Sequence, residues 1–177
     1  MKAKQKVIFM DRDGTLIEEV NFLSRVEDLR LFPFTNEALE RSKALGFRIV
    51  VVTNQSGIAR GLYDEAAMHA IHDAIQERTG NAIEGFYFCP HLPDAGCECR
   101  KPRLGMIDQA QADIDIDMEN SWFVGDKALD IETGIAAGLR TALVRTGYGR
   151  ETENNFELEP DITADNILEV ALDPRFG

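Results

Sequence analysis

Two aspartates, Asp11 and Asp13, directly follow the apolar run 7–10 and are the first residues whose types and spacing could do chemistry. Residues two apart on an extended chain project to the same side, so their carboxylates would converge. Such a pair could bind a hard cation such as Mg²⁺, or divide the roles of nucleophile and acid/base. Gly14 permits a sharp turn and Thr15 adds a hydroxyl. Taken alone, the pattern also fits a solvated loop after a strand.

Further polar groups follow other runs of β-branched and aromatic residues, which predict buried parallel strands. Five polar or small residues follow the run 47–52, namely Thr53, Asn54, Gln55, Ser56 and Gly57. Asp126 follows the run 121–124, and Asp130 comes one helical turn later. Because the carboxyl ends of parallel strands meet at one edge of a sheet, Asp126 could share a Mg²⁺ ion with Asp11. The Thr53 hydroxyl could donate a hydrogen bond to a phosphoryl oxygen.

One loop that contains Pro and Gly carries four soft metal ligands, Cys89, His91, Cys97 and Cys99. Zinc binds four such ligands tetrahedrally, and a closed set is structural, not catalytic. An odd number of cysteines fits a metal site in a reducing compartment better than a disulfide framework. A chance contact between cysteines on a loop is the alternative. Arg100 and Lys101 follow the last ligand, so the metal would position two cations.

The remaining pattern alternates between strands and helices. We expect strands over 7–10, 47–52, 85–88, 121–124 and 139–144, with a short edge strand over 161–163. We expect helices over 36–45, 64–78, 104–112, 130–137 and 166–172, and loops over 17–34 and 151–159. Thr35 is the expected N-cap of the first helix, and His69 and His72 are expected to be surface or core residues of the second. This order predicts a doubly wound, mostly parallel α/β sheet in a single domain, 1–177.

The composition limits the classes of partner. The chain has 177 residues and a formal net charge of −12, which opposes binding to nucleic-acid backbones and anionic membranes. A small anionic substrate, bound by a local cluster of cations, is compatible with this charge. The early apolar run 7–10 is too short for a signal peptide or a membrane span. We therefore expect a cytoplasmic protein, and a monomer, with neither nucleic acid nor membrane as partner.

The motifs also carry a family resemblance. Asp11 to Leu16 resembles motif I of the haloacid dehalogenase superfamily, and the residues 53–57, Lys101 and 125–130 resemble its motifs II, III and IV, in order. The segments TNQSGIARG, CPH and CxCRKP resemble the D-glycero-D-manno-heptose-1,7-bisphosphate 7-phosphatase family and the related histidinol-phosphatase domain. Both imply a capless, Rossmann-like fold with a zinc-binding loop. The heptose family matches better, although the short spacer between His91 and Cys97 is similar to that of histidinol phosphatases.

The resemblance implies a role for each matched residue. Asp11 would be the nucleophile and Asp13 the acid/base, while Thr53 and Lys101 would hold phosphoryl oxygens. Mg²⁺ would be bound by Asp11, the backbone carbonyl of Asp13 and Asp126, and Zn²⁺ by the four Cys and His ligands. The implied substrate is a small phosphorylated sugar. The residues implied to bind it are Arg12, Glu19, Asn21, Phe22, Asn54, Gln55, Ser56, Arg100 and Lys127.

Three other classes of protein are compatible with parts of the pattern. A dehalogenase would need neither Asp13 nor Mg²⁺. A DNA-end 3′-phosphatase resembles the motif set, but the charge of −12 and the lack of a basic stripe argue against it. A non-catalytic, zinc-stabilised binding module would be expected to have lost a core residue. In this chain all five are present, Asp11, Asp13, Thr53, Lys101 and Asp126.

Overall fold

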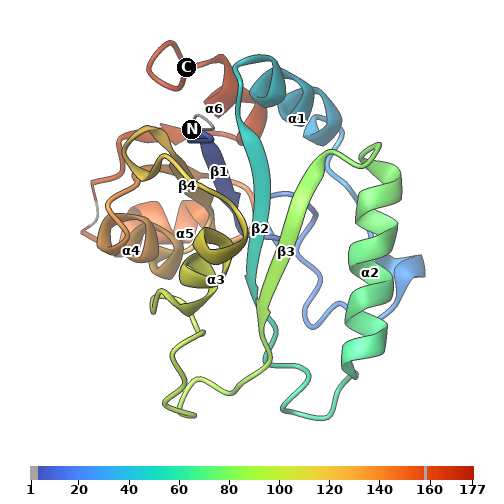
Figure 1. Ribbon diagram of the computed structural model, residues 1–177. Coiled ribbons are helices and arrows are strands. Elements are labelled where there is room, and N and C mark those ends of the chain that lie inside the picture. The colour runs from blue at the N-terminus through green and yellow to red at the C-terminus, as the bar shows by residue number, and fades with distance from the viewer. Residues whose placement is uncertain (1–3, 158) are drawn as a thin grey trace.

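The computed structural model describes residues 4–157 and 159–177, and a parallel sheet forms its centre (Figure 1). Within these residues the sheet has six strands in the order β3-β2-β1-β4-β5-β6. The strands are β1 (Val7–Met10), β2 (Arg48–Asn54), β3 (Ile83–Cys89), β4 (Trp122–Gly125), β5 (Arg140–Val144) and β6 (Ile162–Ala164). Every pairing is parallel, which confirms the predicted fold class.

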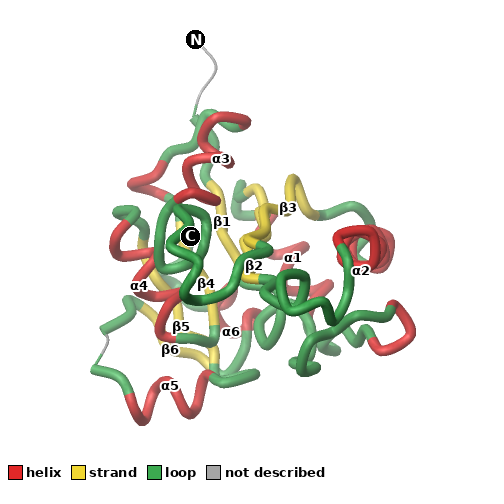
Figure 2. The backbone as a smooth tube through the Cα atoms, turned by 90° about the horizontal axis from the view of Figure 1, so that it is seen from below, coloured by secondary structure: helices red, strands yellow, loops and turns green. Residues whose placement is uncertain are grey.

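Helices cover both faces of the sheet (Figure 2). They are α1 (Thr35–Ala44), α2 (Glu65–Arg78), α3 (Gly105–Asp113), α4 (Ala128–Ala136), α5 (Gly149–Asn155) and α6 (Ile167–Leu172). Side chains of β1 alternate between the faces, so Ile8 packs in the layer that includes α1, α2 and α6, and Phe9 in the layer that includes α3. Burial on both faces explains why the strand is apolar throughout.

The strand order places β1 at a topological switch point. From β1 the chain runs outward through β2 and β3, then returns to β4 on the other side of β1 and continues to β5 and β6. In open α/β sheets, ligands bind in the crevice at the carboxyl ends of strands where the order reverses. Asp11 follows β1 and Asp126 follows β4, so both lie at this crevice.

Two local predictions were wrong. Thr35 is not the N-cap of α1 but its first residue, and Phe34 occupies the cap position. Thr35 is buried, and its hydroxyl donates to the Leu16 carbonyl at 2.8 Å instead of to its own helix. The expected loop 151–159 begins inside α5, whose polar sequence has no apolar period. Tertiary contacts stabilise this helix, since the Thr152 hydroxyl donates to the Asp126 carbonyl at 2.8 Å.

The other boundaries differ less. Helix α4 begins at Ala128, two residues before the predicted start, and the expected loop 17–34 contains one 3₁₀ turn, Val26–Asp28. In the part of the chain that the structure describes, no helix is both long enough and apolar enough to cross a membrane.

Candidate active site

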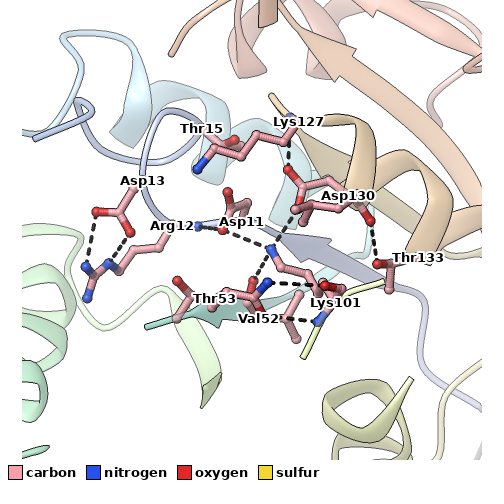
Figure 3. Close-up of polar contacts among 12 residues, drawn as sticks. Asp11, Arg12, Asp13, Thr15, Val52, Thr53, Lys101, Lys127, Asp130 and Thr133 are labelled. Carbon is pink, nitrogen blue, oxygen red and sulfur yellow. Dashed lines mark hydrogen bonds and ion pairs between the residues drawn. The ribbon is translucent and has the colours of Figure 1, made fainter. Parts of the chain in front are cut away.

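Asp11 is the centre of the candidate site (Figure 3). Its side chain is buried beside the end of β1, and its Oδ1 accepts hydrogen bonds from Lys101 Nζ at 3.0 Å and from the Arg12 backbone N–H at 2.9 Å. Burial alone would raise the pKa of Asp11, but the charges of Lys101 and Lys127 outweigh burial and lower it. Asp11 is therefore a carboxylate, the form that a nucleophile requires.

Lys101 is held by three acceptors and by its own backbone. Its Nζ donates to Asp11, to the Val52 carbonyl at 2.9 Å and to Asp130 Oδ1 at 2.7 Å. Asn54 accepts from the Lys101 backbone N–H at 3.1 Å and donates to its carbonyl at 3.4 Å. Burial opposes the charge of Lys101, but Asp11 and Asp130 raise its pKa, so it is an ammonium ion. Asn54, expected to bind substrate, thus also fixes the position of Lys101.

Three carboxylates form a candidate cation site. Oxygen atoms of Asp11, Asp126 and Asp130 lie within 4.8 Å of one another. Burial, together with the charges of Asp11 and Asp130, raises the pKa of Asp126 to about 8, so two neighbouring lysines do not balance three acids. A hard divalent cation would balance them. Asp130 accepts from Lys101 and from the Lys127 backbone N–H at 3.1 Å, which fixes it beside the other two acids.

Two glycines let the backbone approach Asp126. Gly14 (φ +82°) and Gly147 (φ +53°) have left-handed backbones, and a Cβ on either would lie 2.3 or 2.2 Å from Asp126 Oδ2. The same carboxylate accepts from the Tyr148 backbone N–H at 2.8 Å and from the Thr15 hydroxyl at 3.3 Å. The loops after β1 and β5 therefore both fix Asp126, and the sequence analysis singled out Gly14 and Thr15 but not Gly147 and Tyr148.

Substituting Gly147→Ala should displace Asp126. We expect kcat to fall by about tenfold or more, because the added methyl group must move the carboxylate as well as strain the backbone by about 1–3 kcal/mol. The matched control is Gly138→Ala, where φ is +74° but a Cβ would meet nothing within 4 Å. Turnover and thermal unfolding of both variants measure this difference. Equal activity in the two variants would contradict the assigned role of the close contact.

Asp13 is bound by an arginine and an amide. Arg12 Nε donates to Asp13 Oδ2 at 3.0 Å and Arg12 Nη2 to Oδ1 at 3.1 Å, while Gln55 Nε2 donates to Oδ2 at 3.1 Å. Arg12 is only 1% exposed, so its guanidinium faces protein groups on most sides. Thr53 is equally buried, and its hydroxyl accepts from Gln55 Nε2 at 2.7 Å.

His72 on α2 is a neutral core residue. Its Nε2 lies 3.3 Å from Arg12 Nη1, and because a guanidinium only donates, Nε2 must accept. Burial, the nearby charge of Arg12 and the neighbouring His69 lower the pKa of His72 to about 3.

This shift predicts a loss of stability in acid. An unfolded histidine binds a proton below pH about 6.5, whereas His72 in the folded chain does so only near pH 3. The unfolded state therefore binds more protons between these values, and His72 makes the free energy of unfolding fall by up to about 1.4 kcal/mol per pH unit as the pH drops through this window. Urea unfolding at several pH values gives the free energy of unfolding as a function of pH. Between about pH 3 and 6.5 this free energy should change less steeply with pH in His72→Gln than in the unmodified protein. The exposed His69→Gln is the control, and an unchanged slope in His72→Gln would contradict the assignment.

These groups border a cavity of about 570 Å³. All nine residues expected to bind substrate line it, as do Asp11, Asp13 and Lys101, whereas Thr53 and Asp126 lie behind its wall. Among the lining residues that sequence reasoning missed are three aromatic and two acidic side chains, those of Tyr63, Tyr148, Phe156, Glu132 and Glu151. Tyr148 could have been found, since it follows a predicted strand and a Gly, but Glu151 depends on the unrecognised helix α5.

Among the described residues that line the cavity, one buried side-chain oxygen has no hydrogen-bond partner. Glu19 Oε2 is buried and, among the described residues, accepts no hydrogen bond. Burial raises the pKa of Glu19, while Lys127 opposes that change. Lys127 itself lies 5.0 Å from the centre of the Tyr148 ring. A ligand with a hydroxyl group would satisfy the carboxylate.

The four Cys and His ligands converge, with their ligand atoms within 4.8 Å of one another. Sγ of Cys89 lies 3.1 Å from Sγ of Cys99 and 3.7 Å from Sγ of Cys97, and Nδ1 of His91 lies 3.2 Å from Sγ of Cys99. A tetrahedron with Zn–S bonds of about 2.3 Å would separate its sulfur atoms by roughly 3.8 Å, so the donor set fits zinc. Arg100, which follows the cluster, donates to the His91 carbonyl at 3.3 Å.

A parallel α/β sheet with paired aspartates after its central strand, a buried lysine and a further acid defines a haloacid dehalogenase-like hydrolase, and a HAD-hydrolase-like family model matches residues 98–170. The chain is 34% identical to D-glycero-beta-D-manno-heptose-1,7-bisphosphate 7-phosphatase of Haemophilus ducreyi, over 94% of this chain and 96% of that protein. It belongs to the D-glycero-D-manno-heptose-1,7-bisphosphate 7-phosphatase family, whose members are phosphoric monoester hydrolases.

Two further comparisons agree. The chain is 41% identical to D-glycero-alpha-D-manno-heptose-1,7-bisphosphate 7-phosphatase of Photorhabdus laumondii, over 85% of this chain and 90% of that protein. It also matches the crystal structure of D,D-heptose 1,7-bisphosphate phosphatase from B. bronchiseptica complexed with magnesium and phosphate. The TM-score is 0.87 at 32% identity, covering 95% of this chain and 97% of that one.

Proposed function

We propose that this chain hydrolyses the C7 phosphate of D-glycero-D-manno-heptose 1,7-bisphosphate through a covalent intermediate on Asp11. The observation that carries the proposal is the buried Asp11 carboxylate, paired with Lys101 beside a cavity at the topological switch point. The names of the relatives favour the heptose bisphosphate over histidinol phosphate, which is the substrate that the short spacer between His91 and Cys97 would favour.

The proposed reaction has two steps. An Asp11 oxygen attacks phosphorus in line while protonated Asp13 gives its proton to the sugar oxygen, and the electron pair of the breaking P–O bond stays on that oxygen. Asp13, now ionised, takes a proton from the water that attacks the aspartyl-phosphate, and phosphate leaves. Lys101 holds Asp11 and neutralises charge near the phosphoryl oxygens. The Thr53 hydroxyl oxygen accepts a hydrogen bond from Gln55 Nε2, so its own O–H stays free to donate to a phosphoryl oxygen.

Two metal ions belong to the proposal. Asp11, the Asp13 backbone carbonyl and Asp126 would hold Mg²⁺, which when bound offsets the repulsion between the carboxylate and the phosphate. Support comes from the crowding of three buried acids, since burial and the charges of Asp11 and Asp130 together raise the pKa of Asp126. A structural Zn²⁺ would be held by four ligands, Cys89, His91, Cys97 and Cys99.

The rest of the substrate would be recognised by the cavity walls, because no cap domain is inserted within residues 4–157 and 159–177. Arg100 and Lys127 are the cations available to the second phosphate, since Arg12 and Lys101 already face acids. Glu19 Oε2 would accept from a sugar hydroxyl. We further propose a cytoplasmic monomer without nucleic-acid or membrane partners, in keeping with the net charge of −12.

The test is phosphate release, with Mg²⁺, from heptose 1,7-bisphosphate and from histidinol phosphate side by side. We expect kcat/KM to favour the bisphosphate by roughly a hundredfold, or about 2.7 kcal/mol of transition-state discrimination. A preference for histidinol phosphate would overturn the substrate assignment while leaving Asp11 as nucleophile. If the protein hydrolyses neither substrate, both the heptose bisphosphate and the histidinol phosphate assignments are rejected.

A further inference from the structure

Gln55 connects Asp13 to a tyrosine that the proposed mechanism does not use. The Tyr63 hydroxyl donates to Gln55 Oε1, and Arg12 Nη2 donates to the same oxygen at 3.1 Å. Two donors at one end of the amide fix which atom is the oxygen. The NH₂ end must therefore face Asp13, at 3.1 Å, and Thr53, at 2.7 Å.

Tyr63 is held in place by the loop after β2. A Cβ on Gly57 would lie 2.2 Å from the Tyr63 ring, so the ring packs directly against the glycine backbone. Close approach of a side chain, not a left-handed backbone, thus requires glycine at this position. The ring also forms part of the cavity wall. The hydroxyl of Tyr63 consequently has little freedom to leave Gln55.

His72 supports Asp13 from the other side, through Arg12. Its ring stacks on Phe86 with centroids 4.5 Å apart and an interplanar angle of 17°, and its Nε2 accepts from Arg12 Nη1. Three of the other four N–H groups of Arg12 donate to Asp13 and Gln55. One guanidinium therefore joins α2 to both oxygens of Asp13.

These contacts leave one direction on Asp13 open. Oδ2 accepts from Arg12 Nε and from Gln55, whereas within the described residues Oδ1 accepts only from Arg12 Nη2. A carboxyl oxygen has two lone-pair sites, so Oδ1 keeps one for a proton. Asp13 lines the cavity with 15% of its side chain exposed, which gives that proton a route to a bound ester.

We propose that Tyr63 and His72 are positioning residues for Asp13, acting through Gln55 and Arg12 respectively. Together they fix the carboxyl group so that the proton on Oδ1 meets the leaving oxygen as the P–O bond breaks. The rate gain from general acid catalysis depends on this alignment of the proton with the leaving oxygen. The inference rests on the proposed function, in which Asp13 protonates the leaving group.

The test compares two phosphate esters, an alkyl ester (glycerol phosphate) and p-nitrophenyl phosphate. The alkoxide leaves only with a proton, whereas nitrophenolate leaves without one, and kcat/KM reports only steps up to departure of the leaving group. Tyr63→Phe keeps the ring but removes the donor to Gln55. We expect kcat/KM for the alkyl ester to fall by about tenfold, with less than about a twofold change for the aryl ester. The control is Tyr87→Phe, which loses a hydrogen bond to Asp113 outside the cavity. It should leave the ratio of kcat/KM for the alkyl ester to kcat/KM for the aryl ester unchanged.

His72 is tested in the same way. His72→Phe keeps an aromatic ring over Phe86 but removes the acceptor, so the alkyl ester should again lose about tenfold. His72→Gln restores an acceptor and should recover most of the loss. His69→Phe, on the exposed side of the same helix, is the matched control. Thermal unfolding shows whether each His72 variant is folded. If a His72 variant does not fold, the result for Tyr63→Phe decides the test.

An equal loss for both esters in Tyr63→Phe would overturn the inference, because it would indicate a role in binding or folding instead of in proton transfer. An unchanged ratio would overturn it as well. If the unmodified enzyme releases phosphate from neither these esters nor heptose 1,7-bisphosphate, the proposed function itself has failed. The two failures are therefore separate observations.

Discussion

Substituting Asp11→Asn should reduce phosphate release by roughly 10⁴-fold or more while leaving the protein folded. The amide has nearly the same shape, but it cannot form an acyl phosphate and carries no charge. Lys101 would keep its second partner, Asp130, at 2.7 Å, so the loss of one carboxylate does not leave a buried charge unpaired. The change also relieves repulsion among three crowded acids, so we expect a melting temperature close to that of the unmodified protein.

The control for this prediction is Asp13→Asn. The Asp13 side chain acts as acid for the leaving group and then as base for water, so in its variant kcat/KM should fall by about 10²–10⁴-fold with sugar phosphates and much less with p-nitrophenyl phosphate, whose leaving group needs no proton. Asp11→Asn should lose activity equally with both esters, because both require the nucleophile. Residual activity of Asp11→Asn at or above the level of Asp13→Asn would remove Asp11 from the role of nucleophile.

Removing the loop metal should have the second large effect. Binding energy at a structural zinc site is folding energy for the segment that supplies its ligands. Cys97→Ser breaks the closed set of four and should lower the melting temperature by about 10 °C, since each kcal/mol lost shifts a chain of this size by about 2–4 °C. Activity should fall as well, because Arg100 and Lys101 follow Cys99 directly and Arg100 bonds to the His91 carbonyl.

Several measurements separate the loop metal from the catalytic metal. Metal analysis should find zinc in the purified protein and lower occupancy in Cys97→Ser. After chelation, Mg²⁺ alone should restore little activity, and Mg²⁺ with Zn²⁺ should restore most of it. Asp94→Asn, an exposed change in the same loop, is the matched control and should resemble the unmodified protein. A zinc-free protein with full stability and activity would contradict the structural role.

Local chemistry explains why much of the site could be predicted. Asp11, Asp13 and Asp126 lie within three residues of the end of a β-branched or aromatic run, and such runs form parallel strands whose carboxyl ends meet at one edge. The zinc ligands lie within eleven consecutive positions, 89–99, so their meeting depends on one loop alone. In both cases sequence neighbours carry the signal, and the fold class follows from the order of the strands.

Contacts between distant residues decided the rest. Helix α5 has no apolar period and forms because Thr152 bonds to the Asp126 carbonyl, 26 residues away. Arg12 contacts His72, 60 residues away, and Thr15 donates to Asp126, 111 residues away. The sequence by itself determined which groups arrive at the catalytic edge, because strand patterns and loop spacing are local. Only the tertiary structure decided which of them face the cavity and which hold the others, because buried donors must find acceptors wherever the folded chain supplies them.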